Sequence, residues 1–221
     1  MKYSHEYKTW IFDCDGVLLD SNLIKTEAFY EIGLSYCKEQ ADELVVYHKQ
    51  FGGISRFDKF KYFFETILQR KEYKEDLAAA LVRYSLLVKS KLMQCPEAEG
   101  LRLFLDEIPE GSRKIVVSGG LQSEVRESFI QRGLADYFDA IYGSPANKME
   151  ILQKEVERGL LFFPAVFIGD SKYDYESAKA FGIDFIFVSC YSEFDGWRDY
   201  FKDKDALIVS NLSDIRLKLL K

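Results

Sequence analysis

The sequence predicts an α/β fold, a doubly wound parallel sheet with an α-helical domain inserted after its first strand. From residue 100 onward, short apolar runs alternate with stretches of helical periodicity, which is typical of βαβ units. Between residues 21 and 95 the periodicity is helical throughout and no convincing strand occurs. We therefore expect a core domain formed by residues 1–20 and 96–221, and a helical cap domain formed by residues 21–95.

The first strand is predicted over the apolar run at residues 10–12, which is followed by Asp13, Asp15 and Gly16. A continuous apolar run is typical of a strand whose sheet is covered by helices on both faces. Alternate residues of a strand share a face, so Asp13 and Asp15 are expected to point into one crevice beyond the strand's carboxyl end. Gly16 allows the chain to turn there. Taken alone, the pattern also fits a solvated Asp-Gly turn.

Four helices are predicted in the inserted segment. Ser21 is a candidate N-cap for a helix over residues 21–37, and a second helix is expected over 42–51. Ser55 starts a third helix with a capping-box pattern that has Asp58 in place of the usual Glu. The fourth helix is expected over 75–93. The third helix carries an apolar stripe that we interpret as packing rather than a ligand site: Phe57, Phe60, Phe64, Ile67 and Leu68.

In the second part of the chain, helices and strands are expected to alternate. The predicted helices cover 100–108, 122–132, 148–158 and 174–181, with one more at the end of the chain; the predicted strands cover 114–117, 140–142, 165–168, 185–188 and 207–209. A polar, aromatic segment, Tyr191–Phe201, separates the last two strands. The sequence leaves open whether this segment is surface, a contact with the cap or a partner interface.

Composition narrows the class of protein. A net charge of −6 over 221 residues argues against a nucleic-acid or anionic-membrane surface, because both need basic patches. The four cysteines are far apart and show no zinc-site spacing. No apolar signal core and no run of membrane-spanning length is found. We expect a cytoplasmic protein with reduced cysteines; its oligomeric state is left open.

Three further polar clusters follow or precede apolar runs. Ser118 follows the strand predicted at 114–117, Lys148 begins a predicted helix, and Asp170 and Asp174 follow the strand predicted at 165–168. Each has an ordinary explanation: a turn with a helix cap, a solvated lysine, and a loop with a helix cap. Together, four carboxylates in one crevice would repel one another by about 4 kcal/mol per pair at 4 Å and an effective dielectric near 20. Oxygen ligands without His or Cys favour Mg²⁺ as the ion that offsets this repulsion.

The order of these clusters resembles the four-motif signature of the haloacid dehalogenase superfamily, in the branch with a small helical cap that includes phosphoglycolate phosphatases and β-phosphoglucomutases. The resemblance covers essentially the whole chain and implies a Rossmann-like core. It implies that Asp13 is the nucleophile that forms an aspartyl-phosphate, and that Asp15 is the general acid and base.

The resemblance also assigns the remaining site residues. Mg²⁺ would be held by Asp13, the backbone carbonyl of Asp15 and Asp170, with Asp174 binding directly or through water. The phosphoryl oxygens would be bound by three residues: Ser118, Gly119 through its backbone N–H, and Lys148.

We expect selectivity among substrates to come from the cap, since no residue of the core motifs is expected to contact the leaving group. Asn22 and Lys25 lie near the predicted cap entrance, and Arg56 is a candidate contact for an anionic or polyhydroxylated leaving group. The alternative is that Arg56 is an exposed residue at a helix N-terminus.

The expected activity is a Mg²⁺-dependent phosphatase acting on a small phosphorylated metabolite, such as a sugar phosphate or phosphoglycolate. Asp15 disfavours a dehalogenase, which lacks the second acid, and Arg56 cannot form the imine of a phosphonoacetaldehyde hydrolase. Lys25 replaces the histidine of β-phosphoglucomutase-like enzymes, and Gly169 replaces their usual Glu. Both departures favour a phosphatase over a mutase, so a sugar phosphomutase is only the second hypothesis. A non-catalytic binding protein on the same fold is the third.

Overall fold

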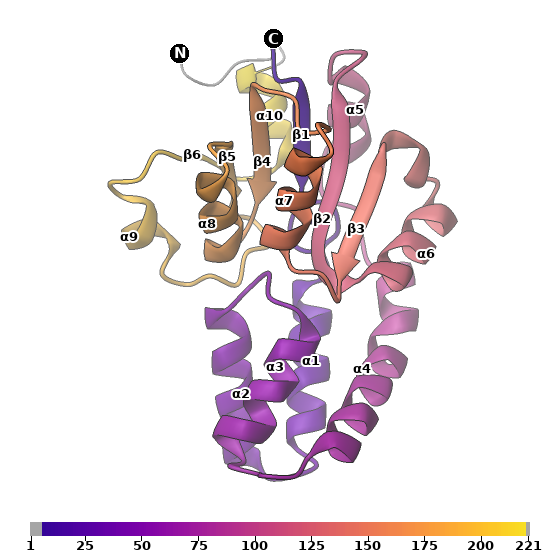
Figure 1. The fold of residues 1–221 in the computed structure, drawn as a ribbon, viewed down its shortest axis with the longest axis vertical. Coiled ribbons are helices and arrows are strands. Elements are labelled where there is room, and N and C mark those ends of the chain that lie inside the picture. The colour runs from indigo at the N-terminus through magenta and orange to yellow at the C-terminus, as the bar shows by residue number, and fades with distance from the viewer. Residues whose placement is uncertain (1–5, 220–221) are drawn as a thin grey trace.

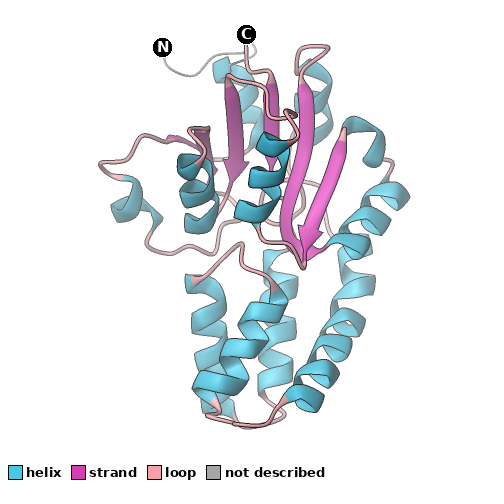
Figure 2. Cartoon of the chain, viewed as in Figure 1, coloured by secondary structure: helices cyan, strands magenta, loops and turns pink. Residues whose placement is uncertain are grey.

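A six-stranded, all-parallel sheet forms the upper part of the molecule (Figures 1 and 2). The computed structural model describes residues 6–219. The strand order is β3-β2-β1-β4-β5-β6, so the order reverses beside β1, as in a doubly wound fold. The strands are β1 (Thr9–Phe12), β2 (Arg113–Leu121), β3 (Ala140–Ser144), β4 (Ala165–Gly169), β5 (Asp184–Val188) and β6 (Leu207–Val209).

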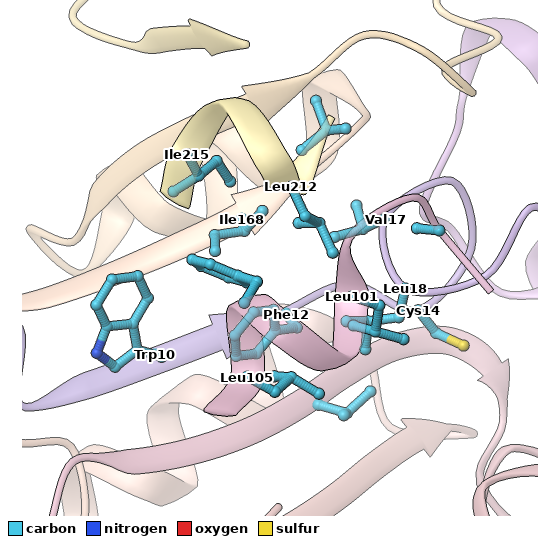
Figure 3. Close-up of a cluster of buried hydrophobic side chains, with 14 of the residues drawn as sticks. Trp10, Phe12, Cys14, Val17, Leu18, Leu101, Leu105, Ile168, Leu212 and Ile215 are labelled. Carbon is cyan, nitrogen blue, oxygen red and sulfur yellow. The ribbon is translucent and has the colours of Figure 1, made fainter. Parts of the chain in front are cut away.

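Helices cover both faces of the sheet, which is why the central strands are continuously apolar. On one face, Phe12 and Trp10 of β1 pack in a buried cluster with Leu105, Leu212 and Ile215 (Figure 3). On the other face, Ile11 belongs to a second cluster that includes residues of α7 and α8. The helices of this part are α5 (Leu101–Glu107), α6 (Gln122–Arg132), the 3₁₀ turn η2 (Ala135–Tyr137), α7 (Lys148–Glu157), α8 (Lys172–Ala180), α9 (Trp197–Phe201) and α10 (Leu212–Leu219).

The inserted segment is all-helical and lies beyond the carboxyl ends of the strands (Figure 1). Phe29, Phe60 and Tyr84 contact one another in a third buried cluster, separate from the two clusters of the sheet. The helices are α1 (Asn22–Gly33), α2 (Lys38–Gln50), α3 (Arg56–Tyr62), the π-helical turn η1 (Phe63–Ile67) and α4 (Lys74–Gln94).

Two chain segments connect the helices to the sheet and run side by side. The amide of Ala98 donates to the carbonyl of Leu18 (2.9 Å), and the amide of Asp20 donates to the carbonyl of Pro96 (3.0 Å). These bonds join the entrance and the exit of the inserted segment.

The predicted α/β class and parallel sheet are confirmed, and several element boundaries were wrong. The sheet strand β2 runs on to Leu121, so the Ser118-Gly119-Gly120 stretch lies in the strand and is not a turn. The first helix ends at Gly33, four residues before the predicted Cys37, and the short helix α9 was not predicted. In the predicted apolar stripe of the third helix, Phe60 and Phe64 belong to the third cluster, here called the cap cluster, and Ile67 and Leu68 pack against it, as expected. Among residues 6–219, no helix is long and apolar enough to cross a membrane.

Candidate active site

Three aspartates meet beyond the carboxyl ends of β1 and β4. Asp13 directly follows β1, Asp170 directly follows β4, and Asp174 lies in the first turn of α8. The two strands are neighbours at the point where the strand order reverses, so their ends open into one crevice. One carboxylate oxygen of each aspartate lies within 4.8 Å of the other two, and all three side chains are buried. The structure thus brings together three of the residues predicted as metal ligands.

Lys148, the first residue of α7, places its ammonium group among these carboxylates. Its Nζ lies 2.9 Å from Oδ1 of Asp13 and 2.5 Å from Oδ1 of Asp174. The alternative of a solvated lysine is wrong, because only 1% of the residue is exposed. One ammonium offsets one of three negative charges, so the cluster retains an excess of negative charge when all three carboxylates are ionised.

Burial and this excess of negative charge raise the pKa values of Asp13 and Asp170. Burial raises the pKa of Asp13 to about 7; Lys148 opposes the rise, whereas the charges of Asp174 and Asp15 add to it. Burial, together with the charges of Asp13 and Asp174, raises the pKa of Asp170 well above its usual range. The donor atoms are all carboxylate oxygens, which suit a hard divalent cation. Such a cation would relieve the repulsion that the protons otherwise relieve.

Asp174 is held from both sides. Its Oδ2 accepts hydrogen bonds from the amide (3.1 Å) and the hydroxyl (2.7 Å) of Ser171 in a capping box at the start of α8. Its Oδ1 accepts from Lys148. A Cβ on Gly169 would lie 2.4 Å from the Cβ of Asp174, so a glycine is needed for this close packing. Asp174 therefore caps a helix and positions Lys148 at the same time; whether it binds a metal directly or through water stays a prediction.

Asp170 is fixed by Asn22, the first residue of α1, and packs against the turn at Gly16. Its Oδ2 accepts from Nδ2 of Asn22 (2.7 Å), which also donates to the carbonyl of Tyr191 (2.9 Å). Gly16 has φ +75°, and a Cβ on it would lie 2.3 Å from Oδ2 of Asp170. Only glycine tolerates both the left-handed backbone and this contact.

Asp15 belongs to a separate ion pair. Its Oδ2 accepts from the Lys25 ammonium, and its Oδ1 accepts from the Ser21 hydroxyl (2.6 Å). Burial favours the protonated acid, but Lys25 and the hydrogen bond from Ser21 outweigh it and lower the pKa of Asp15 below its usual value. Ser21 does occupy the N-cap of α1 as predicted, but its hydroxyl makes no cap hydrogen bond.

The end of β2 carries the predicted phosphate-binding residues. The Ser118 side chain is fully buried, and its hydroxyl accepts from the amide of Gly120 (2.9 Å). A Cβ on Gly119 would lie 2.4 Å from the carbonyl oxygen of Gly53, so the loop between α2 and α3 packs directly on this strand end. The contacts of Ser118, Gly119 and Lys148 with a phosphoryl group stay predictions.

A small cavity of about 60 Å³, space for a few water molecules, lies between the sheet and the inserted helices. Asp13, Asp15 and Asp170 line it from the core. From the helices, basic and aromatic residues line it, including Lys25, Phe29, His48, Arg56, Lys59 and Tyr84.

Arg56 is buried in this wall, with 5% of the residue exposed, so the alternative of an exposed helix-end residue is wrong. Its guanidinium donates to both carboxylate oxygens of Glu124 on α6 (3.0 and 2.5 Å) and to the hydroxyl of Ser85 (2.9 Å). It also lies 4.5 Å from the ring centre of Tyr84. Arg56 thus joins the inserted helices to the core; its contact with a leaving group stays a prediction.

Sequence reasoning missed Lys59 and His48 as cavity residues. Arg56, Lys59, Phe60 and Phe63 are all buried, and they follow the spacing i, i+3, i+4 and i+7 of one helix face. A lysine in register with buried phenylalanines was the available signal.

The start of the segment at 191–201 contacts the inserted helices, which is one of the alternatives that the sequence left open. The carboxylate of Glu193 accepts from the hydroxyl of Thr26 (2.6 Å) and lies 3.7 Å from Nε2 of His48 and 3.5 Å from Nζ of Lys49. This loop of the core therefore forms part of the cavity wall.

Comparison with known proteins agrees with this geometry. Residues 10–188 match the model of a protein family described as haloacid dehalogenase-like hydrolases. The chain belongs to this family. The resemblance predicted from the four motifs is therefore confirmed.

Individual relatives are similar over almost the whole chain. A phosphorylated carbohydrates phosphatase from Thermotoga maritima is 27% identical over 194 residues, which cover 84% of this chain and 87% of that protein. A predicted phosphatase from Clostridium acetobutylicum has the same fold, with a TM-score of 0.74 at 22% identity over 96% of this chain and 97% of that one. A β-phosphoglucomutase from Clostridium difficile has a TM-score of 0.71 at 16% identity over 96% and 94% of the two chains. The prediction of a phosphatase-type hydrolase is supported by these relatives.

Proposed function

We propose that the protein is a Mg²⁺-dependent phosphomonoester hydrolase that acts on a small phosphorylated metabolite through an aspartyl-phosphate on Asp13. The observation that carries this proposal is the buried cluster of Asp13, Asp170 and Asp174 around Lys148. The similarity to a phosphatase of phosphorylated carbohydrates supports the substrate class. The free cysteines are consistent with a reducing, cytoplasmic location, which is part of the proposal.

Asp13, Asp170 and the backbone carbonyl of Asp15 would hold the Mg²⁺, with Asp174 near it. When bound, the ion neutralises charge on the phosphoryl oxygens and on the carboxylates. Lys148 keeps Asp13 in place and offers a second positive charge to the phosphoryl group.

The first step transfers the phosphoryl group to Asp13. A carboxylate oxygen of Asp13 forms a bond to phosphorus, the bond from phosphorus to the leaving oxygen breaks, and Asp15 donates a proton to that oxygen. The pairing with Lys25 keeps Asp15 ionised in this structure, so Asp15 must first take a proton from water or from a protonated phosphoryl oxygen of the substrate.

The second step releases phosphate. Asp15, now a carboxylate, takes a proton from water, whose oxygen attacks phosphorus and breaks the bond to Asp13. The inserted helices act as the cap domain: they close over the cavity and exclude other water until the substrate is seated.

The test compares the wild type with Asp13→Asn and, as a matched control, Asp203→Asn, which changes an exposed aspartate outside the cavity. Phosphate release from a panel of phosphorylated metabolites is measured with Mg²⁺ and with a chelator. We expect Mg²⁺-dependent turnover that Asp13→Asn abolishes and Asp203→Asn preserves. Turnover that survives Asp13→Asn unchanged would disprove the role of Asp13.

A second readout tests the intermediate. Asp15→Asn with an aryl phosphate, whose leaving group needs little protonation, should slow the second step more than the first. Mass spectrometry should then detect one added phosphoryl group, and fragmentation should place it on Asp13. An added group on any other residue would contradict the proposed nucleophile.

A sugar phosphomutase is the second candidate, favoured by the fold shared with a β-phosphoglucomutase. It predicts that a hexose 1-phosphate yields the 6-phosphate rather than free phosphate. Product analysis of the wild-type reaction separates the two functions, and the absence of Mg²⁺-linked stabilisation and of all turnover would favour a non-catalytic protein.

A further inference from the structure

The inserted helices contribute four cationic side chains to the cavity wall, and three of them are paired with carboxylates. Lys25 pairs with Asp15, Arg56 pairs with Glu124, and Lys49 pairs with Glu193. Lys59 differs: among residues 6–219, no carboxylate lies within ion-pair distance of its ammonium. It is 3% exposed and lines the same cavity as Asp13 and Asp170.

Neutral groups hold Lys59 in place. Its ammonium donates to Nδ1 of His48 (2.8 Å) and to the carbonyl of His48 (3.4 Å). An ammonium has three N–H donors, so one remains for a ligand in the cavity. The ring of Phe29, whose centre lies 5.6 Å from Nζ, supplies a further contact with the cation.

His48 is oriented by the core loop. Because Nδ1 accepts from Lys59, the imidazole proton belongs on Nε2, which faces Glu193 at 3.7 Å. Burial and the neighbouring Lys59 lower the pKa of His48 to about 3, so the imidazole is uncharged and offers the ammonium of Lys59 no negative charge. Burial and repulsion from Lys25 likewise lower the pKa of Lys59 to about 7, which is the state of a cation that lacks an anionic partner.

We propose that Lys59 binds an anionic group on the leaving-group part of the substrate. The preferred substrates are then compact phosphomonoesters that carry a second negative group, a carboxylate or a second phosphate. This inference rests on the proposed function for the phosphoryl end of the site. The small cavity volume favours a short spacing between the two anionic groups.

The test uses substrates matched except for the second charge. 3-Phosphoglycerate and glycerol 3-phosphate share a three-carbon backbone and differ in a carboxylate, and glycerol 1,3-bisphosphate and glycerol 3-phosphate differ in a phosphate. The variants are Lys59→Met, Lys59→Arg and the control Lys61→Met, which removes an exposed lysine from the same helix. kcat and KM are measured separately for each substrate.

We expect the wild type to prefer the doubly anionic member of at least one pair, and the favoured pair identifies the second group. Lys59→Met should lower kcat/KM for that member about tenfold to hundredfold, mainly through KM, as expected for a lost charge-assisted hydrogen bond. The singly anionic member should change little, Lys59→Arg should restore part of the preference, and Lys61→Met should retain all of it. Equal losses on both members, or no wild-type preference, would overturn the inference.

Calorimetric titration separates this result from a failure of the proposed function. The same compounds are titrated with Mg²⁺ into wild-type protein, Lys59→Met and the inactive Asp13→Asn. Binding that favours the doubly anionic member and depends on Lys59, without any turnover, would retain the inference and reject the hydrolase. Turnover of both members without dependence on Lys59 would retain the hydrolase and reject the inference.

Discussion

Two buried lysines in one site have opposite protonation behaviour because their neighbours differ. Asp13 and Asp174 outweigh the cost of burying Lys148 and raise its pKa above the usual lysine value. Burial lowers the pKa of Lys59 to about 7, since its direct partners are uncharged. The protein itself supplies the carboxylate partners of Lys148, whereas the direct partners of Lys59 are neutral. In our proposal, the substrate supplies the anionic partner of Lys59.

The carboxylate cluster leads to a prediction at the same scale. The folded-state pKa values of Asp13 and Asp170 are raised, so their contribution to stability is present below about pH 4 and is lost as the pH rises, for Asp13 through about 7. Asp170→Asn should therefore raise the melting temperature of the metal-free protein above pH 7 while abolishing the increase caused by Mg²⁺. Wild-type stabilisation by Mg²⁺ should itself grow as the pH rises towards 7, because the ligands must lose protons.

Thermal unfolding with and without Mg²⁺, measured at several pH values, checks this, with Asp203→Asn as the exposed control. A metal-free Asp170→Asn protein that is less stable than the wild type would show that Asp170 stabilises the fold, contrary to the repulsion argued here.

At the scale of elements, the loop between α2 and α3 touches the end of β2. The carbonyl oxygen of Gly53 occupies the space that a Cβ on Gly119 would need, at 2.4 Å. Both partners are backbone, so neither can move aside by a rotamer change. Closure over the cavity therefore requires the absence of a side chain at residue 119.

Gly119→Ala should hold this loop away from the strand. We expect kcat/KM to fall about tenfold to hundredfold, since displacements near one ångström at a site have effects of this size. The melting temperature should change little, because the cores of both domains are untouched. Gly196→Ala is the control, because its Cβ would meet its nearest atom at 3.6 Å. Unchanged kinetics in Gly119→Ala would show that this contact is not needed for closure.

At the scale of the molecule, the inserted helices have a hydrophobic core of their own, separate from the two cores on the faces of the sheet. Phe60 lies in the cap cluster and Phe167 in a sheet cluster, and both are fully buried. The two linking segments hydrogen-bond to each other and join the two parts.

Phe60→Ala should therefore loosen the cap selectively. A buried Phe→Ala change costs about 3–5 kcal/mol, and hydrogen exchange should accelerate in residues 22–94 while β1 and β4 stay protected. Phe167→Ala should have the opposite pattern. Equal acceleration in both parts after Phe60→Ala would show that they unfold as one unit and would contradict the predicted division at residues 20–21 and 95–96.

Much of this architecture could be predicted because its signals are local. The apolar runs before Asp13 and Asp170 indicated buried strands, and Gly16 indicated a turn after the first of them. Other features needed contacts between distant residues. Ser21 has the side chain of an N-cap, but its hydroxyl bonds to Asp15, and nothing near Arg56 in the sequence indicates its pairing with Glu124.

By itself, the sequence determined the fold class and the order of the polar motifs, because hydrophobic periodicity and chain direction are properties of neighbouring residues. Only the tertiary structure decided which charges are compensated. The local sequence does not distinguish Lys25, Arg56 and Lys59. Lys25 and Arg56 are paired with carboxylates, from residues up to 68 positions away, and Lys59 is not.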